Sequence, residues 1–351
     1  MLSVAVFAGK VQPTARPTIA YDGTACRRGG VLHRQQQSLR MTALICGSFA
    51  YDNIMVFQGR FADEILPDKV HILNVSFLVP QLRKEFGGCA GNIAYTLDML
   101  GGAALPMGTV GEDFAPYRKR LNNLGIDDRY VKSVEGSFTA QAYIVTDLDD
   151  NQITAFHPGA MSEAHQQRVP TDQGVTLGLV SPDGRDGMIE HATQFAEAGI
   201  PFIFDPGQGM PMFDGQDLNT FIEQATYVAL NDYECGMLCE RTGLSPEQVA
   251  QRVEALIVTR GAEGSRIYSA GKVLEIPVVK AARLSDPTGC GDAYRGGLLY
   301  GLQQGMDWET TARVAALCGS IKIEQAGTQN HQFSAESFAA RFADEFGYSL
   351  S

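Results

Sequence analysis

Short apolar segments alternate with amphipathic ones along the chain from Met41 onward. Residues 92–100 place Ile93, Leu97 and Leu100 on one helical face, and Gly101 and Gly102 follow as a stop signal. Apolar runs bounded by Gly, Pro, Ser or Asn are typical of buried strands. Runs of this kind cover residues 42–46, 175–180, 200–204, 227–230 and 255–258.

Two further signals support helices in the second half of the chain. Ser245 and Gln248 bracket Pro246 as a capping box, with proline at the first helical position. The last helix is predicted from Phe338, Phe342 and Phe346, which are spaced by four residues and therefore share a face.

Alternation of strands and helices over this length predicts an α/β fold with a mostly parallel, doubly wound sheet flanked by helices. In such sheets ligands bind beyond the carboxyl ends of the strands. Small or polar residues follow the predicted strands at Ser48, Asp205, Asn231 and Thr259. We therefore expect a binding site along that edge.

Two segments, residues 53–79 and 138–157, do not fit the alternation. Both have the character of β-ribbon, and the second turns at residues 149–151. Because neither pairs with a helix, we expect a small β-sheet over one end of the main sheet, acting as a lid or a dimer surface.

The first 40 residues differ from the rest. They carry six basic residues against one acid and show little periodicity, so we expect a poorly ordered extension followed by one domain over residues 41–351. An Arg-rich, acid-poor start is compatible with an organelle transit peptide. An upstream extension or misassigned start, with Met41 opening the domain, is the favoured interpretation.

Composition excludes several classes of function. The formal net charge of −12 disfavours nucleic-acid partners, and no apolar run reaches the length of a membrane span. The seven cysteines form no C-x-x-C pair, and the histidines show no zinc-ligand spacing. We expect a cytoplasmic protein with free thiols and no zinc site.

The most informative segment is 286–297, which reads DPTGCGDAYRGG. Gly289 and Gly291 stand at a helix start, where free N–H groups and the helix dipole bind anions. A carboxylate beside a phosphate site repels the bound phosphate, so its presence needs a purpose. Asp292 is predicted to act as a general base that takes the proton from an attacking hydroxyl. The alternative is a helix-start acid beside a tight glycine turn. No G-x-x-x-x-G-K-[ST] motif is present, which excludes a P-loop kinase.

This segment resembles the signature D-T-x-G-A-G-D-x-F of the ribokinase (PfkB) family. The departures are Pro287, Cys290 and Tyr294, and none of them alters the glycines or the aspartate. The resemblance implies a ribokinase-like fold with a small β-sheet lid. It also implies that the backbone of Gly289, Cys290 and Gly291 forms the anion hole and that Asp292 is the catalytic base.

Residues 87–92, which read GGCAGN, resemble the N-terminal signature of the same family. The resemblance implies that Gly88 and Asn92 hold sugar hydroxyls and that Asp52 accepts two ribose hydroxyls. A carboxylate is suited to accept paired hydroxyls from a vicinal diol. The alternatives are a loop with a helix cap for 87–92 and a solvated turn acid for Asp52.

Two nucleotide motifs follow in the family's order. Asn231 and Glu234 match N-x-x-E, which the resemblance links to Mg²⁺ and its waters; the alternative is an ordinary helix N-cap. Thr259, Gly261 and Gly264 match the nucleotide loop V-T-x-G-x-x-G and would face ATP.

Further features lie at residues 47–52, 59–61, 66–67, 75–79, 90–92, 156–164, 231–234 and 327–329. In these segments the chain is similar, within the family, to bacterial adenosine kinases. The resemblance implies adenosine and ATP as substrates, AMP and ADP as products, and a role in purine salvage. It further implies homodimers through the β lid and K⁺ near Asp286 and Thr288. Four residues would then lie near the nucleoside: Ser48, Ser76, Phe156 and Gln208. Phe156 would stack on the purine; the alternative for it is lid core packing.

Other functions stay open at this point. A ribokinase-like sugar kinase or a broad-specificity nucleoside kinase would present the same sugar contacts. A non-catalytic nucleoside-binding or regulatory protein is a different class. The presence of Asp292 with both glycines argues against it, because a binding protein has no use for a repulsive carboxylate.

Overall fold

The computed structural model describes residues 41–149, 151–171 and 173–350. The interpretation of residues 1–40 as an extension lies outside the described residues, and the domain boundary at 41 stays a prediction.

The main sheet has nine strands in the order β13-β12-β11-β10-β9-β8-β1-β4-β5. The seven neighbouring strands β5, β4, β1, β8, β9, β10 and β11 are all parallel. Strands β12 and β13 extend the sheet beyond β11 with antiparallel pairing. The predicted mostly parallel sheet is therefore confirmed. Its strands are β1 (Thr42–Cys46), β4 (Ala103–Val110), β5 (Tyr130–Ser133), β8 (Val175–Val180), β9 (Phe202–Phe204), β10 (Tyr227–Asn231), β11 (Ala255–Thr259), β12 (Ser265–Ser269) and β13 (Lys272–Ile276).

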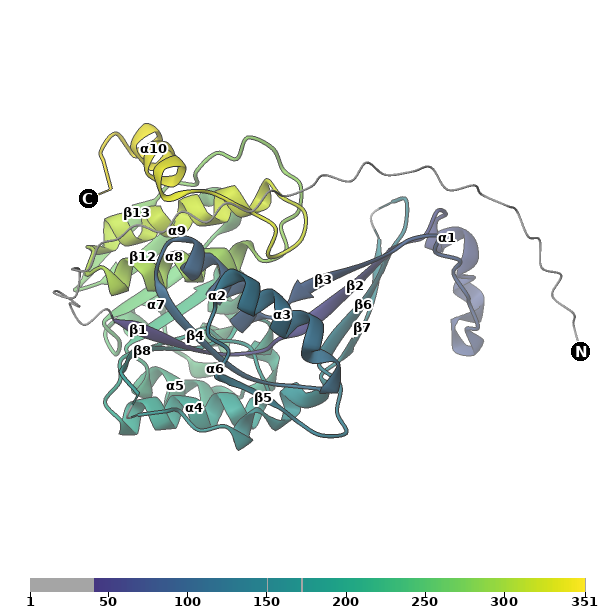
Figure 1. Ribbon diagram of the computed structural model, residues 1–351, viewed down its shortest axis with the longest axis horizontal. Helices are drawn as coiled ribbons and strands as arrows, with labels where there is room; N and C mark the ends of the chain where they lie inside the picture. The colour runs from purple at the N-terminus through teal and green to yellow at the C-terminus, as the bar shows by residue number, and fades with distance from the viewer. Residues whose placement is uncertain (1–40, 150, 172, 351) are drawn as a thin grey trace, which may run out of the picture. The chain divides into compact units, whose positions relative to one another are not determined.

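Helices cover both faces of this sheet (Figure 1). Successive residues of a strand point to opposite faces, and β1 shows the result: Ala43 and Ile45 belong to one core cluster, Leu44 and Cys46 to the other. The first core is closed by α2 (Cys89–Met99), α3 (Ala115–Leu124), α8 (Cys290–Gln303) and α9 (Trp308–Ile323). The second is closed by α4 (Arg185–Glu197), α5 (Gly215–Gln224), α6 (Asp232–Thr242) and α7 (Pro246–Ala250).

The C-terminal helix α10 (Ala335–Phe346) buries Phe338 and Phe342 against α9. This agrees with the predicted face. The Ser245 capping box is also present, because its side chain accepts a hydrogen bond from the Gln248 backbone. Among the described residues, no helix combines the length and apolarity that a membrane crossing requires.

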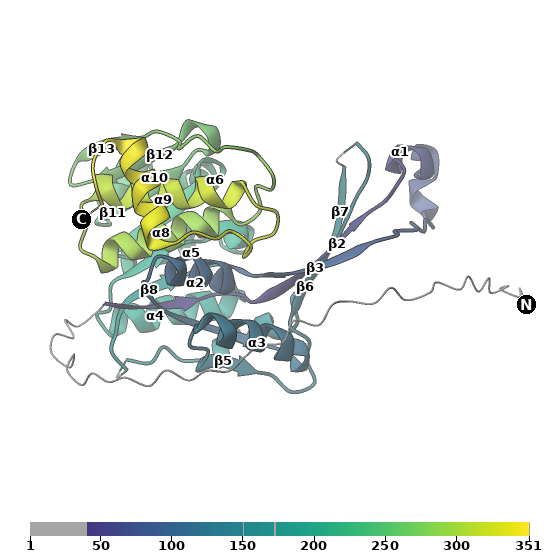
Figure 2. The same ribbon diagram turned by 45° about the horizontal axis from the view of Figure 1, so that its top comes forward.

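A second sheet of four strands, the lid, has the order β3-β2-β6-β7. It projects from one end of the main sheet (Figure 2). Its strands are β2 (Ala50–Val56), β3 (Leu82–Gly87), β6 (Ala140–Thr146) and β7 (Gln152–His157). The whole of β7 is an exposed edge strand. A role of the lid as a dimer surface stays a prediction.

The predicted β-ribbon over residues 53–79 is wrong for most of its length. The strand ends at Val56, and α1 (Phe61–Glu64) and a 3-10 helix (Pro67–Ile72) follow before β3 begins. The aromatic side chains of this segment pack on one another: the ring centroids of Phe57, Phe61 and Phe77 lie 4.9–6.1 Å apart. These side chains therefore pack on one another and do not form a strand pair.

Glycines inside α8 allow this helix to approach its neighbours closely. A Cβ at Gly296 would lie 2.7 Å from Thr96 Cβ on α2, and one at Gly297 would lie 2.5 Å from Ala315 Cα on α9. Real Cβ atoms do not come this close. The helices can therefore make these contacts only because glycine has no side chain at either position. Close backbone packing thus offsets the roughly 1 kcal/mol by which glycine weakens a helix interior.

We expect Gly297→Ala to destabilise the protein although alanine is the better helix former. Overpacking of a rigid backbone contact costs about 1–3 kcal/mol, which exceeds the helix-propensity gain of about 1 kcal/mol. The matched control is Gly236→Ala in α6, where an added Cβ meets no atom within 4 Å. Urea unfolding should show a loss for the first variant and a small gain for the second; equal gains would contradict the packing argument.

Candidate functional site

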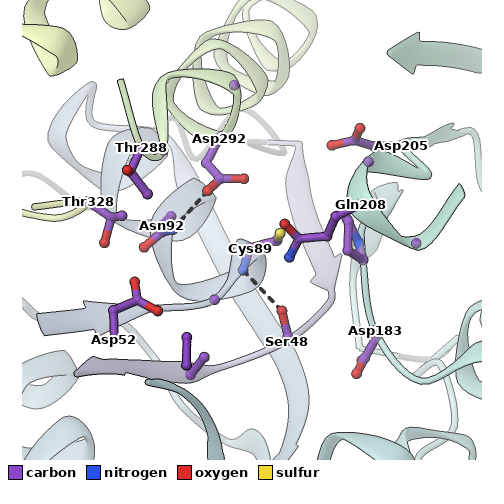
Figure 3. A pocket seen from close by; sticks show the side chains of 18 of the residues that line it. Ser48, Asp52, Cys89, Asn92, Asp183, Asp205, Gln208, Thr288, Asp292 and Thr328 are labelled. Atoms are coloured by element: carbon purple, nitrogen blue, oxygen red, sulfur yellow. Dashed lines mark hydrogen bonds between the residues drawn. The ribbon is translucent and has the colours of Figure 1, made fainter. Parts of the chain in front are cut away.

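A cavity of about 750 Å³ lies at the carboxyl ends of β1, β8, β9, β10 and β11, with β6 and β7 of the lid on its other side. Figure 3 shows part of its lining, with Ser48, Asp52, Asp183, Asp205 and Asp292 arranged around it. Thirteen of the residues predicted from sequence line it: Ser48, Asp52, Gly88, Asn92, Phe156, Gln208, Asn231, Glu234, Thr259, Thr288, Gly289, Gly291 and Asp292.

The carboxylate of Asp292 stands at the first turn of α8. Gly289 caps this helix in the left-handed region, at φ +81°, which favours glycine. Asn92 Nδ2 donates to Asp292 Oδ2 at 2.8 Å (Figure 3). Burial and the charge of Asp205 raise the pKa of Asp292 to about 6, against the Asn92 hydrogen bond and the charge of Arg295. A carboxylate with such a pKa is ionised at neutral pH and can accept a proton.

The opposite side of the cavity holds Asp52 on β2. Gly87 leaves room for this carboxylate, because a Cβ there would lie 2.5 Å from Asp52 Oδ2. Burial, with the charges of Glu85 and Asp286, raises the pKa of Asp52 to about 6. Ser48 Oγ accepts from the Cys89 N–H at 3.2 Å, so it orders the start of α2.

Asn231 and Glu234 form a complete capping box at the start of α6. Glu234 Oε2 accepts from the Asn231 N–H, and Oε1 accepts from Asn231 Nδ2, each at 2.8 Å. The helix-cap alternative is therefore correct as a description of structure, but both residues also line the cavity. Burial and the charge of Asp205 raise the pKa of Glu234.

A metal ion would find few direct ligands here. No group of three or more His, Cys, Asp or Glu able to hold a metal exists among the described residues. Mg²⁺ keeps several waters and takes few protein ligands. Glu234 and Asn231, which line the cavity, would hold such an ion through its waters.

Arg295 and Asp205 form a buried ion pair on the cavity wall that the sequence did not predict. Nε and Nη2 of Arg295 donate to the two carboxylate oxygens of Asp205 at 3.1 and 2.9 Å, and both side chains are at most 7% exposed. The pair joins α8 to the end of β9. Its sequence signal is an arginine three residues after Asp292, in a helix whose other buried residues are mostly apolar.

Asp183 is a second residue that sequence reasoning missed. It follows β8, is 2% exposed and lines the cavity. Its Oδ1 accepts from the Gly184 N–H at 2.9 Å, while Oδ2 has no partner in the described part of the chain. Burial raises the pKa of Asp183 to about 8.

Apolar side chains complete the cavity between the lid and the loops after β8 and β9. Phe156 is half exposed on β7 and faces this space. The other apolar side chains in the wall are Ile144, Met161, Pro182 and Met212.

Five predicted site residues do not line the cavity: Ser76, Gly261, Gly264, Cys290 and Asp286. Ser76 is exposed in the segment beyond α1, away from the cavity wall. Gly261 and Gly264 form the turn between β11 and β12, next to the lining residue Thr259. The Cys290 N–H donates to the Pro287 carbonyl at 3.2 Å, so it is not free for an anion. Both carboxylate oxygens of Asp286 accept backbone N–H groups.

Similar proteins were found in three comparisons. The model of the pfkB family carbohydrate kinases matches residues 50–334. A nucleoside kinase of Methanocaldococcus jannaschii is 33% identical over 260 residues, 74% of this chain and 85% of the relative. The solved structure of Burkholderia thailandensis nucleoside kinase in complex with inosine is 52% identical, with TM-score 0.80, and the match covers 88% of this chain and 99% of that one.

The fold comparison extends to distant relatives. A ribokinase structure from Thermotoga maritima, 17% identical, aligns with TM-score 0.70 over 87% of this chain and 99% of that one. The predicted ribokinase-like fold with a small β-sheet lid is thereby confirmed. From these matches and the cavity at the carboxyl edge of the sheet, we conclude that the chain belongs to the pfkB family of carbohydrate kinases.

Proposed function

We propose that this protein is an ATP-dependent nucleoside kinase. It would transfer the γ-phosphoryl group of ATP to the 5′-hydroxyl of a purine nucleoside. The observation that carries the proposal is one cavity that combines two carboxylates of raised pKa, Asp52 and Asp292, with an apolar wall under the lid. The similarity to nucleoside kinases of two organisms supports it.

The apolar wall favours a nucleoside over a free sugar. Ligand sites of about 300–1,000 Å³ hold molecules larger than a pentose, and this cavity of about 750 Å³ falls in that range. Phe156 and two methionines, Met161 and Met212, supply apolar surface that a ribose cannot use. A purine ring would stack on such surface.

Adenosine is one expected substrate, and the cavity favours a wider range. Adenine presents an amino donor where hypoxanthine and guanine present an oxygen acceptor. The Asp183 carboxyl, with a pKa of about 8, exists in both protonation states near neutrality, so it can donate or accept. The relative from Burkholderia was solved with inosine. We therefore place a broad-specificity nucleoside kinase ahead of a strict adenosine kinase.

The proposed reaction uses the two carboxylates for different tasks. Asp52 accepts the paired ribose hydroxyls, and Asn92 and Gly88 hold the sugar beside it. Asp292 takes the proton of the 5′-hydroxyl as its oxygen attacks the γ-phosphorus in line. The Gly291 N–H and the start of α8 face the charge on the transferred group.

The remaining residues adjust the charge and solvent of the site. Arg295 partly offsets the negative charges of Asp205 and Asp292. Mg²⁺, bound through waters at Asn231 and Glu234, would neutralise charge on the phosphates. Closure of the lid over the nucleoside would exclude water from the cavity.

The function is tested by an acceptor panel with Mg-ATP, in which ADP release is coupled to a dye. The acceptors are adenosine, inosine, guanosine, ribose and fructose, each alone. The proposal predicts turnover with at least two purine nucleosides and at least ten times lower kcat/KM with both sugars. Turnover with ribose or fructose above that of every nucleoside would contradict it.

The pH dependence tests the role of Asp292. The carboxylates of Asp292 and Asp52 must both be ionised for their proposed tasks, so kcat/KM should fall as the pH drops through an apparent pKa of about 6. Asp292→Asn should lower kcat by about 10²–10⁴-fold and leave nucleoside affinity nearly unchanged. If the variant keeps more than a tenth of the wild-type kcat, Asp292 is not the base. The same conclusion holds if the wild-type kcat/KM falls only near pH 4.

A further inference from the structure

A buried lysine lies behind the loop that carries Gly289 and Gly291. Lys322, in the last turn of α9, is 0% exposed. Its Nζ donates to the Asp286 carbonyl at 2.7 Å and to the Gln325 carbonyl at 3.3 Å. Lysine is almost never fully buried unless it is paired. The two carbonyls therefore pair with the Lys322 ammonium group and fix its position behind the loop.

The two carbonyls belong to the loops that frame the start of α8. Asp286 stands three residues before Gly289, and Gln325 stands three residues before Thr328, which packs 3.1 Å from an ideal Cβ at Gly289. The Asp286 side chain ties the loops together, since it accepts from the Thr288 and Gly327 N–H groups at 2.9 Å each. Lys322 thus links both loops at their base.

The same place was expected to hold K⁺, and its residues do not fit that ion. A monovalent cation needs several oxygens with free lone pairs around one space. The carboxylate oxygens of Asp286 face backbone N–H groups, and its carbonyl accepts from the Lys322 ammonium. A second cation beside that ammonium would be repelled.

The charge of Lys322 reaches the reacting end of the cavity. Burial lowers the pKa of Lys322, and the negative charges of Asp286 and Asp292 oppose that fall. Burial likewise raises the pKa of the Cys290 thiol, and the charge of Lys322 opposes that rise. The neighbouring His331 adds no second positive charge, because burial and Lys322 lower its pKa to about 4.

We propose that the Lys322 ammonium takes the place of a monovalent cation in this protein. It orders the loop 286–291 and supplies a fixed positive charge behind the anion-binding amides, so that the enzyme works without K⁺. Lys322 is a positioning residue, because it touches the loop and not the substrates. The proposal rests on the kinase activity proposed above, but part of its test does not.

The test compares salts of equal ionic strength, KCl, NaCl and choline chloride, with Mg-ATP and the best nucleoside of the panel. Wild-type kcat should agree within twofold in all three. Removing an anion-hole donor outright costs about 10²–10³-fold. Because Lys322 acts on the anion hole only through the loop, Lys322→Ala should lose less, about tenfold, in choline and should recover in part with KCl. Lys322→Met fills the space with an apolar chain and should lose as much without recovery. Lys272→Ala, at an exposed lysine on β13, is the control and should match wild type.

Thermal unfolding gives a readout that needs no activity. KCl should raise the melting temperature of Lys322→Ala over its value in choline, and should leave that of the wild type unchanged. Wild-type kcat more than fivefold higher in KCl than in choline overturns the inference while preserving the kinase. Lys322→Met with wild-type kcat in choline overturns it as well. Absence of kinase activity in every salt would contradict the proposed function. The melting temperatures in KCl and choline would then alone decide whether Lys322 takes the place of a monovalent cation.

Discussion

The hydrogen bond from Asn92 Nδ2 to Asp292 Oδ2 depends on the close approach of two helix starts, and the site depends on that bond. Both helices begin after a glycine of positive φ, Gly88 at +89° and Gly289 at +81°. The approach of α8 to α2 is set by Gly296, where no side chain other than hydrogen fits over Thr96. Helix packing therefore leaves Asp292 partly buried. This burial raises the pKa of its carboxyl to about 6, which suits a general base.

Such a site concentrates charge in a poorly solvated place. Asp52, Asp205, Glu234 and Asp292 all line the cavity. Arg295 offsets part of this charge through its ion pair with Asp205. Buried ion pairs add little net stability, because desolvation cancels most of their attraction. Their value here is geometric: Arg295 fixes α8 to β9, and Lys322 fixes the loop before α8 to the end of α9.

Much of the fold could be predicted because its signals are local. The runs at 42–46, 175–180 and 255–258 became β1, β8 and β11, since buried parallel strands are apolar on both faces. Predictions failed where local pattern and tertiary pairing differ. The aromatic residues of 53–79 form their own cluster in place of a strand pair.

The site was predictable to the extent that its residues stand in short motifs. Asp292 and Gly291, or Asn231 and Glu234, are close in sequence and lie together on the cavity wall. Asp183, Arg295 and Lys322 could not be predicted in this way. Their roles arise from partners that only the folded chain supplies, such as Asp205 for Arg295, 90 residues away.

In the proposed reaction Asp292 faces the 5′-hydroxyl while Asp52 holds the ribose diol. The most direct test is the position of the transferred phosphate, read by two-dimensional phosphorus–proton NMR of the product formed from inosine. With Asp292 as the base at the 5′-hydroxyl, the phosphorus should couple to the 5′ methylene protons alone. Coupling to the 2′ or 3′ proton would show that the diol, and not the 5′-hydroxyl, meets the base.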